Sequence, residues 1–373
     1  MMYCSRILVN IKFMGELMHS TLSCSQKYLI FTLALLLSGC VTDTRDRFTT
    51  DRVDPLFREY QGDDKPGAAV SIIHKGAPIV TKTYGMANLE ENLPVKSETN
   101  FRLASVTKQF TALCIMLLVE RDSLSYSSTL KDIFPEFPEY GSQITVQHLL
   151  QHQSGLIAYE DLIAADMKVQ VHDSDVLQLM KNETSTYFQP GTDYRYSNSG
   201  YAVLAMIIEK ISEKSFAEFL QENVFAPIEM NNSVAFENGK STVLHRAYGY
   251  SVEADSIYRN DQSITSAVLG DGGIYSSLDD LFRWDQALYT ELLVSKESMQ
   301  HAFTPALSNY GFGWRIDNYK GHSRVHHTGS TRGFRIVISR FPDDEFTVII
   351  LTNRNGPAVS QIADELTDIF LIE

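Results

Sequence analysis

A serine and a lysine stand three positions apart at the front of an apolar run, in the segment FRLASVTKQFTAL (101–113). Positions i and i+3 of a helix share a face, so the Ser105 hydroxyl and the Lys108 amine are expected to be neighbours. A serine hydroxyl is a weak nucleophile that needs a base, and an uncharged lysine amine can serve as one. N–H groups at a helix N-terminus can also stabilise an oxyanion. The alternative is that Ser105 only caps a helix at 106–121.

A second segment, PGTDYRYSNSGYAVLAMIIEK (190–210), carries groups that such chemistry would use. Tyr196 and Asn198 are predicted in the loop just before a helix that begins near Ser199 or Gly200. A tyrosine near a lysine can carry a proton to a leaving group. An asparagine amide can both donate to and accept from a substrate amide. A buried tyrosine followed by a capping asparagine is the structural alternative.

The third segment, HHTGSTRGF (326–334), lies between two runs with strand-like composition. Gly329 is expected to let a substrate backbone approach closely. Thr328 is expected to donate a hydrogen bond to the substrate, and the N–H of Ser330 to point into a cleft. A turn with an ordinary histidine at His327 is the alternative.

Each of these spacings also occurs a second time, at Ser128–Lys131, Tyr258–Asn260 and His74–Gly76, so none is specific alone. Taken together and in order, they resemble the serine β-lactamase and penicillin-binding protein superfamily, in its class C-like branch. Tyr-Ser-Asn stands in place of Ser-Asp-Asn, and His-Thr-Gly in place of Lys-Thr-Gly. Further matches are LLQHQSGL, GDGGIYSSLDDLFRW and YGFGWRI. The resemblance covers about residues 55–370.

The resemblance implies an acyl-serine mechanism without a metal or other cofactor. In it Ser105 is acylated, and Lys108 and Tyr196 share the general-base and general-acid work. The backbone N–H groups of Ser105 and Ser330 form the oxyanion hole. Substrate orientation is assigned to the remaining matches, namely Asn198, His327, Thr328 and Gly329.

The substrate stays open because of His327. Histidine has an ordinary pKa of ~6.5 and is mostly neutral at pH 7, whereas a lysine there would suit a substrate carboxylate. Arg332 is a weak candidate to compensate. A β-lactam, an ester and a D-Ala-type peptide or amide are therefore all expected substrates. The alternative function is a penicillin-binding or cell-wall-sensing lipoprotein that is acylated without turnover.

The elements that position these segments predict an α/β (α+β) fold of the β-lactamase/transpeptidase type. β-Branched runs around His74-Lys75-Gly76 predict an N-terminal hairpin, and YGFGWRI, SRVHH, FRIVISRF and FTVIILTN predict strands near the end. An isolated hairpin is marginally stable, so both sets are expected in one antiparallel sheet, covered by the first long helix and the last. Residues of about 115–300 are expected to form a mostly helical second lobe, with a ligand cleft between the lobes.

The N-terminus predicts export. Lys27 precedes the apolar segment YLIFTLALLLSGC (28–40), which is short for a membrane span of ~20 residues. It resembles a bacterial lipoprotein signal, with a signal peptide at 1–39 and a lipidated Cys40. An uncleaved anchor is the alternative, and Met1 and Met18 are both candidate starts. The expected arrangement is a tether at 40–54 and one domain at 55–373, in the periplasm and anchored by lipid to the outer membrane.

Composition narrows the expected partners. The chain has 32 basic and 46 acidic residues, a net charge of -14, and no basic patch of the kind that binds nucleic acid. A small-molecule or peptide substrate, including a cell-wall-derived one, is expected. Cys114 lies in an apolar helical run and is predicted to be a buried small residue rather than a nucleophile. His148 and His152 have metal-ligand spacing, but Leu149 stands where a zinc protease has its glutamate, so packing and capping are favoured.

Overall fold

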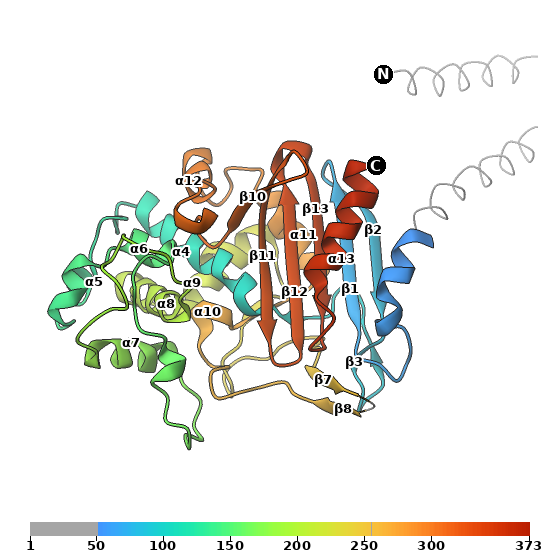
Figure 1. Ribbon diagram of the computed structural model, residues 1–373, viewed down its shortest axis with the longest axis horizontal. Helices are drawn as coiled ribbons and strands as arrows, with labels where there is room; N and C mark the ends of the chain where they lie inside the picture. Colours follow the sequence, from blue (N-terminus) through green and yellow to red (C-terminus); the bar gives the residue numbers. More distant parts are fainter. Residues whose placement is uncertain (1–50, 255) are drawn as a thin grey trace, which may run out of the picture. The chain divides into compact units, whose positions relative to one another are not determined.

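The computed structural model describes residues 51–254 and 256–373 (Figure 1). The chain divides into two units, Met1–Leu56 and Phe57–Glu373, and the second contains the sheet, the helices and the candidate site. The predicted signal peptide, with Cys40 and the rest of the tether up to residue 50, lies outside the described residues. Among the helices of the described part, none combines the length and the apolar character that a membrane crossing needs.

Strands from the two ends of the chain share one antiparallel sheet, in the order β10-β11-β12-β13-β1-β2. Their bounds are β1 Ala68–His74, β2 Ala77–Tyr84, β10 Arg315–Tyr319, β11 His322–Thr331, β12 Phe334–Phe341 and β13 Phe346–Thr352. β1 pairs with β13 along its whole length, which confirms that the N-terminal hairpin joins the C-terminal strands. Lys75 and Gly76 have φ of 51° and 75°, as a two-residue hairpin turn requires.

Helices cover both faces of this sheet (Figure 1). α13 (Val359–Thr367) packs on β12 and β13, and α11 (Leu278–Ala287) packs on β1 and β13. The structure corrects one detail of the prediction. The first long helix, α4 (Lys108–Glu120), packs mainly against other helices rather than on the sheet. Every α4 residue from Lys108 to Leu118 is buried, because this helix runs through the middle of the helical region.

The middle of the chain is mostly helical, as predicted, with short paired strands between the helices. The helices are α5 Leu130–Ile133, α6 Val146–Leu150, α7 Asp173–Asn182, α8 Asn198–Ser212, α9 Phe216–Leu220, α10 Leu269–Gly272 and α12 Lys296–Ala302. The strands are β3 Met86–Asn88, β4 Leu93–Pro94, β5 Phe101–Arg102, β6 Val234–Ala235, β7 Tyr250–Glu253, β8 Ser256–Arg259 and β9 Ile274–Ser276.

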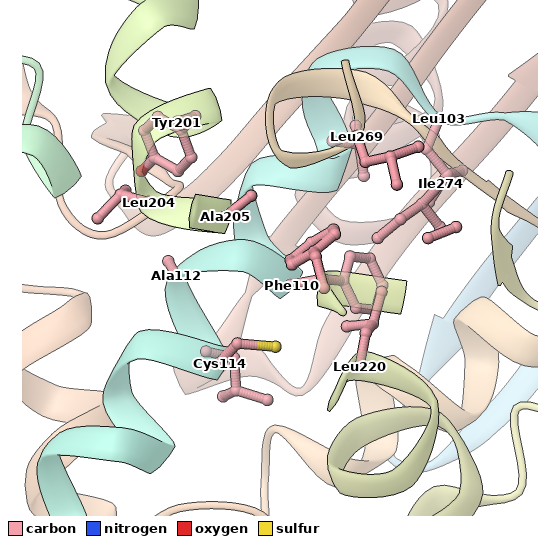
Figure 2. Close-up of a cluster of buried hydrophobic side chains, with 14 of the residues drawn as sticks. Leu103, Phe110, Ala112, Cys114, Tyr201, Leu204, Ala205, Leu220, Leu269 and Ile274 are labelled. Atoms are coloured by element: carbon pink, nitrogen blue, oxygen red, sulfur yellow. The ribbon is translucent and has the colours of Figure 1, made fainter. Parts of the chain in front are cut away.

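α4, α8 and α10 meet in a continuous apolar core (Figure 2). Phe110 stacks on Trp284 with ring centroids 4.1 Å apart, which ties α4 to α11. Cys114 is fully buried in this core, and burial raises the pKa of its thiol. A thiol in such surroundings is unreactive, so the prediction of a packing role for Cys114 is confirmed.

Candidate active site

A cavity of about 180 Å³ lies beside Ser105. Its lining brings together residues that are far apart in the sequence: Arg102, Ala104, Ser105, Tyr159, Glu160, Asn198, Thr265, Asp271, Gly272, Ser330 and Thr331. Three of the residues predicted from the motifs, Ser105, Asn198 and Ser330, are among them. A larger hollow of about 380 Å³ against α11 lacks a hydroxyl paired with a base, so chemistry rather than size selects the site.

Ser105 lies in a short 3-10 helix, η2 (Ala104–Thr107), between β5 and α4. The N-cap positions of η2 and α4 are Leu103 and Thr107, so the alternative that Ser105 only caps the helix is wrong. Ala104 has a φ of 48°, in the left-handed region that costs a non-glycine residue about 1–2 kcal/mol. Such strain is common where a turn must present one side chain, and here it presents the half-buried Ser105 to the cavity.

Lys108 is fully buried one turn later, and its Nζ reaches three oxygens. These are Ser105 Oγ at 3.2 Å, Asn198 Oδ1 at 2.8 Å and the carbonyl oxygen of Asp271 at 2.8 Å. A charged ammonium would donate all three bonds, whereas a neutral amine has two N–H donors and one lone pair. Asn198 Oδ1 and the Asp271 carbonyl oxygen can only accept hydrogen bonds. A neutral Lys108 amine would therefore donate its two N–H groups to them and point its lone pair at the Ser105 hydroxyl. This is the geometry of a nucleophile with its base.

Asn198 links Lys108 to an acidic residue. It is the first residue of α8, and Ser197, not Asn198, is the N-cap, its Oγ accepting the N–H of Gly200 at 3.0 Å. The Oδ1 of Asn198 accepts a hydrogen bond from Lys108, and its Nδ2 donates one to Glu160 Oε1 at 2.7 Å. Glu160 is exposed and lines the cavity, so it presents a carboxylate beside the nucleophile. No motif pointed to Glu160, which reaches the site only through the fold.

Tyr196 also lies close to Lys108. Lys108 Nζ is 5.0 Å from the centroid of the Tyr196 ring, and the guanidinium of Arg315 is 5.7 Å from it. The Tyr196 hydroxyl is buried and has no hydrogen-bond partner among the described residues. Tyr196 is not among the residues that line the cavity. Its role in proton transfer stays a prediction from the resemblance.

His327 is placed differently from the prediction that it contacts substrate. Its ring is 2% exposed, and both nitrogens are engaged within the protein. Nε2 lies 3.0 Å from the Tyr310 hydroxyl, and Nδ1 lies 2.7 Å from the carbonyl oxygen of Thr328, so the proton belongs on Nδ1. Burial, helped by Lys108, lowers the pKa of His327 to about 3. The His327 ring is therefore neutral and buried outside the cavity lining, and it offers no cation to a substrate carboxylate.

The rest of the His-Thr-Gly segment is divided between packing and the cavity. A Cβ on Gly329 would stand 2.1 Å from the carbonyl oxygen of Leu103, so the close approach is real. The approaching group is the protein's own turn before Ser105, not a substrate backbone, which corrects the prediction. Ser330 lines the cavity, and Thr328 is exposed on β11 outside that lining.

Asp271 is a second acidic residue that motif reasoning missed, although the GDGGIYSS match contains it. Its carboxyl accepts from the Tyr159 hydroxyl at 3.2 Å. Burial raises the pKa of Asp271 to about 6, against the opposing effect of Lys108. The backbone carbonyl oxygen of Asp271 accepts a hydrogen bond from Lys108. The ionisable carboxyl of Asp271 therefore belongs to a residue that contacts the base directly.

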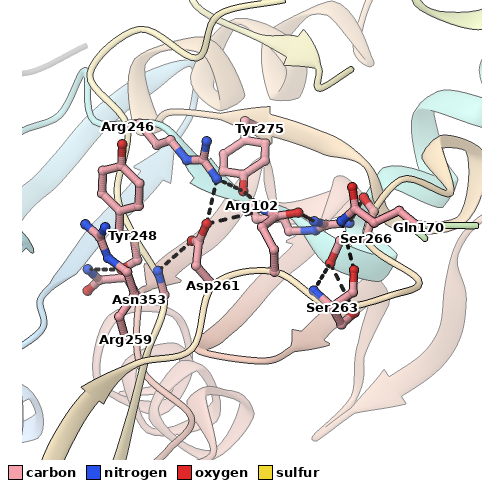
Figure 3. Close-up of polar contacts among 12 residues, drawn as sticks. Arg102, Gln170, Arg246, Tyr248, Arg259, Asp261, Ser263, Ser266, Tyr275 and Asn353 are labelled. Carbon is pink, nitrogen blue, oxygen red and sulfur yellow. Dashed lines mark hydrogen bonds and ion pairs between the residues drawn. The ribbon is translucent and has the colours of Figure 1, made fainter. Parts of the chain in front are cut away.

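Two loops that shape the cavity are tied to each other and to the strand before Ser105 (Figure 3). Gln170 Nε2 donates to the Ser263 carbonyl at 2.8 Å, and Arg102 Nη2 donates to the Ser266 carbonyl at 2.8 Å. Arg246 anchors the same region through an ion pair with Asp261 at 2.6 Å. Polar contacts thus hold both loops in place.

The second copies of the motifs have structural roles. Lys131 Nζ donates to the carbonyl of Phe137, Tyr258 donates to Glu253, and His74 ends β1 at the hairpin turn. His148 Nδ1 accepts the N–H of Thr145 as part of a capping box, as favoured over a metal site.

A serine paired with a buried lysine, at the junction of an antiparallel sheet and a helical region, defines the serine hydrolases of the β-lactamase and penicillin-binding type. The chain belongs to the beta-lactamase family, whose profile matches residues 53–370.

Named relatives agree with this membership. Penicillin-binding protein 4* of Bacillus subtilis is 37% identical over 293 residues, 73% of this chain and 64% of that protein. The D-aminopeptidase of Brucella ovis is 28% identical over 321 residues, 82% of this chain and 59% of that protein. This chain thus spans less than two thirds of the length of either relative. Among solved structures, an octameric penicillin-binding protein homologue from Pyrococcus abyssi superposes with a TM-score of 0.75 at 28% identity, covering 88% of this chain and 77% of that chain.

Proposed function

We propose that this protein hydrolyses amides or short peptides of D-amino acids that carry a free amino group, through an acyl-enzyme at Ser105. The observation that carries the catalytic part is the hydrogen bond between Lys108 Nζ and Ser105 Oγ at 3.2 Å. Similarity to a protein named D-aminopeptidase supports the substrate class.

In the proposed reaction, the amine of Lys108 takes the proton of Ser105 as the serine Oγ bonds to the substrate carbonyl carbon. The N–H groups of Ser105 and Ser330 stabilise the charge that develops on the carbonyl oxygen. The proton then passes through Tyr196 to the leaving nitrogen, and the C–N bond breaks. Water attacks the resulting ester, its proton returns through the same groups, and the acid and free Ser105 are released.

An exposed carboxylate at the cavity favours a substrate with an ammonium group. The cation in the lining, Arg102, is buried and donates to the backbone carbonyls of Gly272 and Ser266. Glu160 presents an exposed carboxylate beside Ser105, and one of its oxygens already accepts from Asn198. Its other lone pairs can accept N–H donors of a substrate ammonium, and such charged hydrogen bonds are among the stronger ones. The neutral His327 does not provide the cation that would favour a substrate carboxylate instead.

A second candidate is a penicillin-binding or cell-wall-sensing protein that is acylated but deacylates slowly. Similarity to a protein named penicillin-binding protein 4* supports it. Fluorescent penicillin that stays on Ser105 for hours, with no turnover of any amide, would favour this candidate over hydrolysis.

The substrate class is tested with D-alanine p-nitroanilide and its N-acetyl derivative, which lacks the ammonium charge. Glu160→Gln should lower kcat/KM for the first about 10- to 100-fold, since a hydrogen bond to a charged group contributes about 1.5–3 kcal/mol. The N-acetyl compound should be a poor substrate for both proteins and should not be affected by the change. Equal losses on both compounds would contradict ammonium recognition by Glu160.

We further propose that the protein is exported and anchored to the outer membrane by lipid on Cys40. The support is the apolar segment at 28–40 that ends in Leu-Ser-Gly-Cys. Labelling cells with a palmitate analogue should mark the wild-type protein and not Cys40→Ser. Equal labelling of both would contradict this proposal.

A further inference from the structure

His152 is a buried histidine that the proposed reaction does not use. It follows α6, is fully buried, and has a φ of 58°. A positive φ is uncommon for residues other than glycine, although histidine adopts it more often than most. A strained residue persists only where its surroundings fix it, so its contacts indicate what the strain serves.

The backbone on both sides of Tyr196 is hydrogen-bonded to His152. The carbonyl oxygen of His152 accepts the N–H of Arg195 at 3.0 Å, and its Nδ1 accepts the N–H of Ser197 at 3.1 Å. Accepting this bond requires an unprotonated Nδ1, which puts the ring proton on Nε2. Burial, together with the nearby Lys108, lowers the pKa of His152 well below its ordinary value, so the acceptor persists at working pH.

The same imidazole supports the Tyr196 ring. The ring centroids of His152 and Tyr196 are 4.3 Å apart, and Tyr310 packs on His152 at 4.4 Å. The hydroxyl of Tyr196 has no partner among the described residues, so its own hydrogen bonding does not fix the ring. His152 thus supplies two backbone hydrogen bonds and the shortest ring contact that hold Tyr196 beside Lys108.

We propose that His152 is a positioning residue that holds Tyr196 against Lys108 for proton transfer. This inference rests on the role proposed above for Tyr196. A change at His152 should therefore act through Tyr196, slowing the proton-transfer step while leaving substrate binding nearly unchanged. A residue that only stabilises the fold would instead lower the melting temperature without this selective effect.

The test is a double-mutant cycle on the full-length protein with D-alanine p-nitroanilide and a p-nitrophenyl ester. Tyr196→Phe and His152→Ala should each lower kcat about 10²-fold or more, with little change in KM. The variant that combines both changes should be no slower than the slower single variant, because the two residues act as one unit. His152→Asn should recover much of the loss, since asparagine tolerates a positive φ and its Oδ1 can accept the Ser197 N–H.

His148→Ala is the matched control, because it removes a capping bond of the neighbouring helix and should lower the melting temperature while kcat stays near that of wild type. Near wild-type kcat in folded His152→Ala, or losses that multiply in the combined variant, would overturn the positioning role. If His152→Ala does not fold, His152→Gly takes its place in the cycle, because glycine accepts the positive φ and removes both the ring and its acceptor. The same two outcomes would then overturn the role. A wild-type kcat in Tyr196→Phe would instead show that the role of Tyr196 in the proposed function is wrong, and this proposal would fall with it.

Discussion

Gly329→Ala should inactivate the protein without touching any catalytic side chain. The added Cβ would stand 2.1 Å from the Leu103 carbonyl oxygen and 3.1 Å from its carbonyl carbon. An ordinary carbon–oxygen contact is ~3.3 Å, so β11 and the turn before Ser105 must separate by about 1 Å. A displacement of about 1 Å between reacting groups can cost about 10²-fold in rate. Overpacking should also destabilise the fold by about 1–3 kcal/mol.

Activity on a p-nitrophenyl ester and urea unfolding measure the two effects. The matched control is Gly200→Ala in α8, where the added Cβ would meet nothing closer than 3.6 Å. Alanine favours a helix over glycine, so this control should be as stable as wild type or more so. Wild-type kcat/KM and an unchanged urea midpoint in Gly329→Ala would refute the argument that the contact with Leu103 positions Ser105.

Three further variants test the site. Lys108→Ala should lower the rate of Ser105 acylation by about 10²–10⁴-fold, seen as a lost burst of p-nitrophenol, and a preserved burst would contradict its role as base. Folding lowers the pKa of His327 from 6.5 to about 3. The contribution of neutral His327 to the free energy of unfolding is therefore complete above pH 6.5 and is lost as pH falls toward 3. His327→Gln should therefore lose less stability than wild type between pH 7 and 4, and parallel urea midpoints would contradict this. Folding raises the pKa of Asp271 from 3.8 to about 6. The contribution of protonated Asp271 to the free energy of unfolding is therefore complete below pH 3.8 and is lost as pH rises through 6. Asp271→Asn should gain stability relative to wild type at pH 8 but not at pH 3.5, and an equal difference at both pH values would contradict this.

The parts of the fold with strong local signals were predictable from sequence. β-Branched runs around the His74-Lys75-Gly76 turn predicted the N-terminal hairpin, and the runs FRIVISRF and FTVIILTN predicted the last two strands. That both belong to one sheet followed from the instability of an isolated hairpin. The pairing of Ser105 with Lys108 followed from their spacing, since three positions bring side chains together in a 3-10 or an α-helix alike.

What the sequence did not predict depends on contacts between distant segments. The 3-10 turn at Ser105 needs the strained Ala104, which propensities do not favour. Glu160 and Asp271 enter the site from segments whose only local signal was a loop or a family match. The positive φ of His152 could not be predicted either, because nothing in LLQHQSGL requires a left-handed backbone conformation at this histidine. Its partners lie about forty-five residues away, at Arg195 and Ser197.

The central claim is that Ser105 is the nucleophile, activated by Lys108. It is tested most directly by treating the full-length protein with a fluorophosphonate probe and measuring the intact mass and the labelled peptide. The account predicts one adduct on the peptide that contains Ser105, none on Ser105→Ala, and much slower labelling of Lys108→Ala. Equal labelling of wild type and Ser105→Ala, or an adduct on a different residue, would contradict it.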